Sequence, residues 1–308
     1  MSPTVPNNGP SGVFAAALTP MADDLSPDGA ALVAHCRWLL AAGCDGVAPL
    51  GTTGEASSFS VAERLAILDA LAESDIPPER LIVGTGSAAL TDAVELTRRA
   101  VAMNVSGCLL LPPFYFKNPS EDGLFAFFSE VIQRVADSRL RLYLYHFPQT
   151  TAVPIGLGLI ERLMARYPKT VAGAKDSSGE LGNMVALARI PQFRVFSGTE
   201  RLLLPILEAG GVGCITAGAN VIAPITAKLY AEWRRSGASE EAKRLQEEVI
   251  RQRLQLDGVP MIPGMKAMLA RRFNRPAWRN VRPPFVRLAA AQEAVLLGKT
   301  EEMGVALP

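Results

Sequence analysis

Short apolar runs alternate with helix-like segments along most of the chain, and this alternation is the feature that most restricts the fold. Eight runs have the length and composition of buried strands, and they begin at Gly12, Asp45, Arg80, Gly107, Leu140, Val171, Phe193 and Val212. Segments with apolar residues at helical spacing lie between them, including residues 29–40, 61–71, 92–103, 121–135, 157–164 and 202–208. Strands separated by helices pair in parallel through crossovers. We therefore predict an α/β fold, a closed (β/α)8 TIM barrel, with an open doubly wound sheet as the alternative.

The barrel is expected to occupy residues 12–225, after a disordered tail over residues 1–11. Beyond the eighth unit, residues 222–256 have helical spacing with a break near Ser236 and Gly237, and further helical pieces cover residues 264–272 and 285–297. No linker rich in Ser, Gly or Pro separates these helices from the barrel. Residues 226–308 are therefore predicted to be a C-terminal helical extension packed on the barrel rather than a second domain.

The charge balance favours a small partner. Lys plus Arg number 31 and Asp plus Glu number 30, so the chain has no general field for nucleic acid or anionic lipid. We therefore expect a small-molecule substrate, no nucleic acid and no membrane, and no apolar run reaches the roughly 18 residues of a membrane span. The arginine-rich stretch 271–284 is interpreted as a subunit contact or a solvated surface. Four scattered cysteines without CxxC pairing favour a reducing, cytoplasmic location.

Motifs of other enzyme classes are incomplete. The run LIVGTGSAA, residues 81–89, matches G-x-G-x-x-A, but the next strand ends in LLPP without an acidic residue to hold a ribose. These glycines are therefore expected to leave room at the barrel mouth. The two histidines, His35 and His146, are far apart, and neither HExxH nor GxSxG is present, so no metal and no cofactor are expected.

The stretch VAGAKDSSG, residues 171–179, places Lys175 directly after a run of small apolar residues. At the C-terminal end of a barrel strand it would point to the active-site face, where burial disfavours the ammonium and favours an amine that attacks a carbonyl. The other six lysines lie in polar or helical surroundings. From position alone, a lysine that reaches out to solvent or pairs with Asp176 is an equally good interpretation.

The loop GTTGE, residues 51–55, follows the second strand. Gly51 frees the backbone, and successive amides together with the hydroxyls of Thr52 and Thr53 form a group of donors suited to a carboxylate. An ordinary turn with an N-capping threonine is the alternative.

Tyrosines follow two further strands. In LYLYHFPQTT, residues 142–151, alternation places Tyr145 at the mouth, where a phenol can transfer protons during imine formation, although a half-buried core tyrosine is the commoner fate. His146 should face the barrel wall instead. Tyr115 lies in the proline-bounded loop PPFYFKNPS, residues 112–120, and is predicted to be exposed and available to a partner subunit.

Taken together, GTTGE, PPFYF, YHFP, GAKDSSG, FSGTE and GCITAGAN occur in the order and approximate spacing of the dihydrodipicolinate synthase and N-acetylneuraminate lyase family, which the chain resembles from Gly12 to Arg287. The resemblance implies a (β/α)8 barrel with a helical C-terminal extension and lyase chemistry through a covalent Schiff base with pyruvate or another 2-oxo acid. It also implies that no metal or cofactor is used, and that the protein is a homotetramer built as a dimer of dimers.

Carried over by position, the resemblance gives Lys175 the role of the Schiff-base lysine and Tyr145 that of the proton-transfer tyrosine. Thr52 resembles the relay hydroxyl between Tyr145 and Tyr115, and Tyr115 would reach the neighbouring subunit's site. Thr53 resembles the group that holds the carboxylate of the 2-oxo acid.

Three further positions match the pocket of the family: Gly51 beside the threonines, and Gly198 and Ile215 from the seventh and eighth strands.

One departure bears on the substrate. In true dihydrodipicolinate synthases the tyrosine segment resembles Y-N-x-P-x-R-T, and its arginine binds the carboxylate of aspartate semialdehyde; here Thr150 stands in its place. A hydroxyl cannot form a bidentate charge-assisted pair. Thr150, Gln149, Ser177 and Ser178 suit a polyhydroxylated or neutral aldehyde better, which favours reversible aldol cleavage of a 2-keto-3-deoxy sugar acid. A synthase using aspartate semialdehyde, and a dehydratase or deaminase of a related 2-oxo acid, are the alternatives.

The sequence leaves room for two other classes of function. A catalytically silent relative would bind a 2-oxo acid without turning it over, with a pocket blocked by Phe114, Phe116 or Phe147. A phosphate-binding barrel would use the glycines near strands seven and eight, Gly198, Gly210 and Gly211, but Arg201 is the only cation in those loops.

Overall fold

The computed structural model describes residues 9–303 and contains eight parallel strands. They are β1 Gly12–Ala15, β2 Gly46–Val47, β3 Ile82–Gly84, β4 Gly107–Leu110, β5 Leu142–His146, β6 Val171–Asp176, β7 Arg194–Ser197 and β8 Gly213–Thr216. Their order in the sheet is β2-β1-β8-β7-β6-β5-β4-β3, and a parallel bridge between Val47 and Leu81 joins the two ends. The predicted (β/α)8 barrel is therefore confirmed, and the open sheet is excluded.

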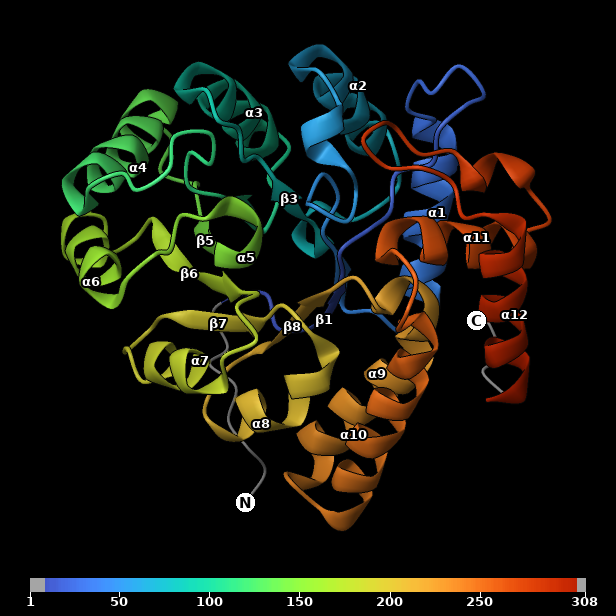
Figure 1. Cartoon of the computed structure of the whole chain (residues 1–308). Coiled ribbons are helices and arrows are strands. Elements are labelled where there is room, and N and C mark those ends of the chain that lie inside the picture. Colours follow the sequence, from blue (N-terminus) through green and yellow to red (C-terminus); the bar gives the residue numbers. More distant parts are fainter. Residues whose placement is uncertain (1–8, 304–308) are drawn as a thin grey trace.

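Helices surround the barrel (Figure 1). Those that follow strands are α1 Gly29–Ala41, α2 Val61–Ala72, α3 Leu90–Ala102, α4 Glu121–Val135, α5 Pro148–Thr151, α6 Leu157–Arg166, α7 Leu181–Ala188 and α8 Leu203–Glu208. Polar side chains begin several of them: Ser60 and Glu63 form a capping box on α2, and Ser120 accepts from the Gly123 amide on α4. Helices α5 and α7 were not predicted from the sequence.

The apolar core has two layers. One cluster fills the inside of the barrel with alternate residues of the strands, namely Phe14, Ala16, Ala48, Ile82, Leu109, Tyr143, Tyr145, Phe196, Val212 and Ile215. A larger cluster lies between the sheet and the helices. Because successive strand residues face opposite layers, Tyr143 and Tyr145 face inward while His146 faces the helices.

The C-terminal extension consists of α9 Ala219–Ser236, α10 Glu240–Arg253, α11 Met261–Arg272 and α12 Ala290–Glu302. Figure 1 shows these helices gathered along one side of the barrel. The boundary predicted at 225/226 falls inside α9, and residues 285–289, expected to be helical, precede α12. Most of the predicted tail, residues 1–8, lies outside the described residues, while the Gly9 and Pro10 carbonyls accept hydrogen bonds from Arg194.

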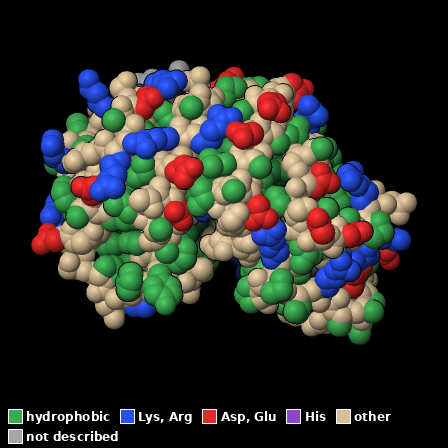
Figure 2. All heavy atoms as spheres, turned by 90° about the horizontal axis from the view of Figure 1, so that it is seen from above, with side chains coloured by type: hydrophobic (Ala, Val, Ile, Leu, Met, Phe, Trp, Pro, Cys, Tyr) green, Lys and Arg blue, Asp and Glu red, His purple; other side chains and the backbone are tan. Residues whose placement is uncertain are grey.

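The surface carries charges of both signs. Figure 2 shows lysines and arginines interspersed with carboxylates over the face it displays. Over residues 9–303, no helix combines the length and apolarity needed to cross a membrane.

A buried histidine connects α1 to the barrel. His35 Nε2 lies 2.8 Å from Asn220 Oδ1, and the Asn220 amide group donates to the Ala16 and Ala217 carbonyls, which identifies Oδ1 as the acceptor and Nε2 as the donor. Burial lowers the pKa of His35 to about 4, although the hydrogen bond to Asn220 opposes the shift. His35 is therefore neutral in the folded protein near pH 7.

This burial predicts an acid-sensitive fold. The unfolded chain protonates His35 near pH 6.5 and the folded protein only near pH 4, so the unfolded state binds more protons in this range and stability falls as the pH drops through it. The contribution is about 3 kcal/mol. Urea unfolding of wild type and His35→Gln from pH 7 to pH 4 should show a shallower decline for the variant; parallel profiles would contradict the assignment.

Candidate active site

The neighbouring strands β5 and β6 place an amine and a phenol side by side. Tyr145 pairs in register with Lys175, and Lys175 Nζ donates to Tyr145 Oη at 3.1 Å. The same nitrogen lies 4.2 Å from the centroid of the tyrosine ring. Lys175 is only 4% exposed, so it neither reaches out to solvent nor turns outward to pair with Asp176, which faces the opposite layer. The geometry favours a nucleophile with an adjacent proton acceptor.

The environment of Tyr145 favours its ionised form. Burial disfavours the phenolate, but the Lys175 ammonium and hydrogen bonds from Thr52, Lys175 and Ser177 outweigh it, so the pKa of Tyr145 lies below its ordinary value. Thr52 Oγ1 lies 3.5 Å from Tyr145 Oη. A tyrosine tuned in this way can accept and return a proton beside the lysine.

The GTTGE loop, residues 51–55, positions Thr52 in a tight turn with a left-handed residue at each end. Leu50 has φ 57° and Glu55 has φ 56°, flanking the turn. Gly51, Thr52 and Tyr145 line a pocket with Gly84 and Gly86 of the third strand end. A side chain at Gly84 would collide with the Leu50 carbonyl, so only glycine lets the GTTGE loop approach the end of β3. This agrees with the prediction that the glycines after the third strand leave room at the barrel mouth. Thr53 is buried nearby and is not among the lining residues.

A buried ion pair anchors this loop to the C-terminal extension. Lys266 of α11 and Glu55 both have fully buried side chains, and Lys266 Nζ donates to Glu55 Oε1 at 2.5 Å and to the Asn280 carbonyl at 2.7 Å. The other Glu55 oxygen accepts from the Arg282 amide at 3.1 Å. Both oxygens of the Glu55 carboxylate accept hydrogen bonds, so the position of the threonine loop depends on residues more than 200 positions away in the chain.

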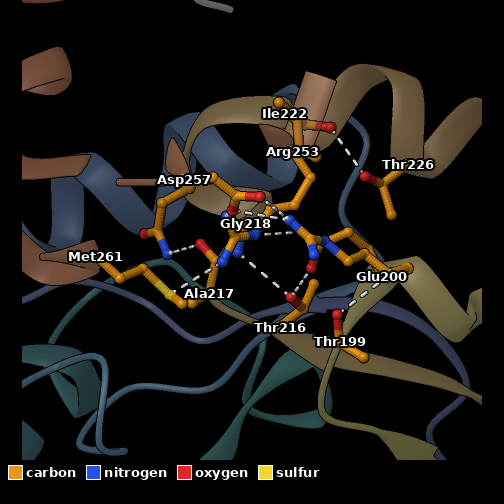
Figure 3. A network of polar contacts seen from close by, with 12 residues as sticks. Thr199, Glu200, Thr216, Ala217, Gly218, Ile222, Thr226, Arg253, Asp257 and Met261 are labelled. Carbon is orange, nitrogen blue, oxygen red and sulfur yellow. Dashed lines mark hydrogen bonds and ion pairs between the residues drawn. The ribbon is translucent and has the colours of Figure 1, made fainter. Parts of the chain in front are cut away.

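A second polar network lies at the ends of β7 and β8 (Figure 3). The buried Glu200 carboxylate accepts from the Thr216 hydroxyl and lies 3.1 Å from Arg253 Nε. Arg253 also approaches Asp257, which accepts two hydrogen bonds from Arg201 at 2.9 and 3.0 Å. The extension thus supplies a cation to a buried carboxylate here as well.

The predicted positions on the later strands lie close to the amine and phenol. Ser177 contributes a hydrogen bond to Tyr145, and its amide donates to the His146 carbonyl at 2.8 Å. A side chain at Gly198 would collide with Ser177, so the absence of a side chain there leaves room for the serine. Ile215 is fully buried in the inner cluster that also contains Tyr145.

Two predicted residues lie at the rim. Thr150 is exposed on the short helix α5, next to Gln149, whose amide donates to the Ser178 carbonyl at 2.5 Å. Tyr115 is 74% exposed and its ring contacts the equally exposed Phe116. The single chain therefore does not bring Tyr115 to Tyr145.

Two other sequence interpretations are settled by position. His146 faces away from the mouth and accepts from the Ile155 amide at 3.1 Å, as expected for a wall residue. Gly198 lies at the carboxyl end of β7, whereas Gly210 and Gly211 precede β8 at the opposite end of the barrel. The alternative of a phosphate site is therefore wrong, because its glycines lie at opposite ends of the barrel. Among residues 9–303, no group of three or more His, Cys, Asp or Glu side chains is arranged to hold a metal ion.

Sequence reasoning missed Lys266. It singled out Lys175 as the lysine in apolar surroundings, yet Lys266 is even more deeply buried. The apolar neighbours Met265 and Ala267 were a signal of burial. What separates the two lysines is the partner, because Lys266 meets a carboxylate and Lys175 meets a phenol.

The fold and the site define a barrel enzyme whose polar groups gather at the carboxyl ends of the strands. Residues 9–297 match the Dihydrodipicolinate synthetase family. An uncharacterized DapA-like lyase from Chloroflexus aurantiacus is 38% identical over 231 residues, 74% of this chain and 76% of that protein. A 4-hydroxy-tetrahydrodipicolinate synthase from Acidiphilium cryptum is 32% identical over 78% of this chain and 80% of its own length.

Solved structures of proteins from the same family have the same fold as this chain. Dihydrodipicolinate synthase from Agrobacterium tumefaciens superimposes with a TM-score of 0.86 at 30% identity, covering 96% of this chain and 99% of that one. YagE, a prophage protein of the dihydrodipicolinic acid synthase family from E. coli K12 in complex with pyruvate, has a TM-score of 0.85 at 25% identity with the same coverage. The chain belongs to the dihydrodipicolinate synthetase family, and it is a lyase.

The Glu55–Lys266 pair predicts an asymmetric response to mutation. Lys266→Met leaves a buried carboxylate uncompensated and should lower the free energy of unfolding by about 3–5 kcal/mol. Glu55→Gln/Lys266→Met removes both charges and should cost less than that single change. The exposed pair Glu240→Gln/Lys243→Met on α10 serves as control and should change the free energy of unfolding much less than Lys266→Met does. Urea unfolding measures all three, and a double variant less stable than Lys266→Met would refute the buried pair.

Proposed function

We propose that this protein is a class I lyase that forms a Schiff base with a 2-oxo acid and reversibly cleaves a 2-keto-3-deoxy sugar acid. The observation that supports this most strongly is the buried Lys175 amine, 3.1 Å from the Tyr145 hydroxyl at the carboxyl end of the barrel. Thr52 completes the set as the hydroxyl next to Tyr145. The pyruvate complex of the related YagE belongs to that protein, and it supports a 2-oxo acid as the ligand here.

The first half of the reaction makes the covalent intermediate. Tyr145 takes a proton from the Lys175 ammonium, and the amine attacks C2 of the 2-oxo acid to give a carbinolamine. Tyr145 returns a proton to the leaving hydroxyl, which departs as water and leaves an iminium. In this proposal the backbone amides of Thr53 and Gly51, together with the hydroxyls of the loop, hold the substrate carboxylate without a cation.

The second half breaks the carbon chain. Tyr145 accepts the proton of the C4 hydroxyl as the C3–C4 bond breaks, the aldehyde leaves, and the bonding electrons move to the iminium to form the enamine of pyruvate. Protonation at C3 and hydrolysis release pyruvate and restore Lys175. No external electron acceptor is needed, because the protonated imine serves as the electron sink, and we propose that the enzyme uses no metal or other cofactor.

Residues around the intermediate define the rest of the pocket in this proposal. Gly198 and Ile215 form the wall from β7 and β8, and Ser177 and Thr150 contact the variable half of the substrate. Thr150 favours a hydroxylated or neutral aldehyde over one bearing a carboxylate. The named relatives make 4-hydroxy-tetrahydrodipicolinate synthase the second candidate.

Assembly belongs to the same proposal. Tyr115 and Phe116 form an exposed aromatic pair on a loop near the mouth, which fits a subunit contact better than a solvated surface. We propose a homotetramer, a dimer of dimers in which Tyr115 reaches the neighbouring subunit's site. Four buried free cysteines fit a reducing cytoplasm.

Trapping tests the covalent step. Wild-type protein treated with pyruvate and borohydride should acquire one reduced adduct on Lys175, located by peptide mass spectrometry. Lys175→Met should acquire none, and Tyr145→Phe should form the adduct roughly a hundredfold more slowly, because the proton acceptor beside the amine is gone. Lys228→Met, an exposed substitution on α9, is the matched control and should react like wild type. Folded wild-type protein without an adduct would refute the proposal.

Substrate choice tests the role of Thr150. The wild type should cleave a 2-keto-3-deoxy sugar acid, and it should condense pyruvate with aspartate semialdehyde poorly. Thr150→Arg should raise kcat/KM for that condensation about tenfold or more by restoring a charge-assisted pair. Thr91→Arg, exposed in the first turn of α3 on the same face, controls for added charge. Robust condensation by the wild type would instead identify a synthase.

A further inference from the structure

The amino-terminal end of the barrel, opposite the catalytic residues, contains a second cavity. Its volume is about 610 Å³, within the range of small-molecule sites. The segments that line it precede β4, β5, β6 and β8 or begin β7, as Ser106, Arg141, Lys169, Val212 and Arg194 show. In a parallel barrel these segments all lie at the end away from the active site. We call it the basal cavity.

Positive charge dominates the basal cavity. Arg141, Lys169, Arg189 and Arg194 line it, and no Asp or Glu is among its lining residues. The whole chain is almost neutral, so this excess is local. Like charges gathered around a concave surface raise the local potential and attract anions.

The two rim cations are open to a ligand. Lys169 and Arg189 are exposed, and within residues 9–303 neither forms an ion pair with a carboxylate. Arg141 donates to the Ser138 and Leu140 carbonyls at 2.9 Å, which orients its guanidinium without neutralising it.

The floor of the basal cavity is polar and closely fitted. The Tyr143 ring lies between Gly107 and Gly173, and a side chain at either glycine would crowd the ring. Burial raises the pKa of Tyr143 to about 12, so the floor presents a neutral phenol and not a counter-charge. Beside it, Arg194 donates to the Gly9 and Pro10 carbonyls at 3.0 and 2.8 Å.

We propose that the basal cavity binds a small anion with two or more acid groups. A single negative charge would balance only part of the lining, whereas a polycarboxylate or a phosphate compound can contact several cations at once. The volume leaves room for such a molecule, and the rim cations can close on it because no carboxylate competes for them. The site is separate from the proposed lyase site and does not depend on it.

The experiment uses the whole protein. Citrate and inorganic pyrophosphate are titrated by calorimetry, in chloride buffers of matched ionic strength, against wild type and Lys169→Ala/Arg189→Ala. We expect saturable binding to the wild type and a Kd at least tenfold higher for the double variant. Lys243→Ala/Arg244→Ala, on the exposed face of α10, is the control and should bind like wild type. Circular dichroism and urea unfolding confirm that each variant is folded.

The outcomes separate the sources of the anion. Tighter binding of citrate would support the site and identify polycarboxylates as its ligands, and tighter binding of pyrophosphate would support it and identify phosphate compounds. Failure of the wild type to bind either anion saturably, or equal affinity in wild type and the Lys169/Arg189 variant, would overturn the proposal.

Discussion

Parallel pairing of eight strands is the constraint on which the rest of this structure depends. Because all strands run in the same direction, every segment that follows a strand meets at one face, and residues as distant in sequence as Thr52, Tyr145 and Ser177 become neighbours. The register between β5 and β6 then sets the chemistry, since it pairs Lys175 with Tyr145. A one-residue slip would turn one of them toward the helices.

The second requirement is that the loops at this face keep their shape. Two of them contain carboxylates buried at the barrel mouth, Glu55 after β2 and Glu200 after β7, and an isolated buried charge is costly. The C-terminal extension supplies the cations, Lys266 for the first and Arg253 for the second. The extension is therefore not an appendage, because the mouth of the barrel would hold uncompensated charges without it.

Local signals predicted the barrel well and the polar network poorly. Periodicity identified eight strands and most helices, and strand-end position identified Lys175 and Tyr145, because both follow from rules that act over a few residues. The short helix α5 and the partner of Lys266 could not be found this way. Glu55 and Lys266 are 211 positions apart, and only the three-dimensional fold brings them together. The role of Tyr115 stays a prediction for a similar reason, since it depends on a second chain.

The two inward-facing tyrosines of β5 show how the barrel separates its ends. Tyr143 and Tyr145 are two residues apart on one strand and are both buried, so desolvation alone would raise both pKa values. It does so at Tyr143, whose pKa rises to about 12 even though Arg194 and Arg141 oppose the shift. At Tyr145 the opposing effects win, because the Lys175 ammonium donates directly to the phenol and Thr52 and Ser177 add hydrogen bonds. One strand thus holds a neutral phenol at the base and an exchangeable proton at the mouth. Each phenol has a cation beside it, Arg194 at Tyr143 and Lys175 at Tyr145. The difference lies in the balance of effects, because desolvation outweighs the arginines at Tyr143, whereas at Tyr145 the cation acts together with two hydroxyl groups.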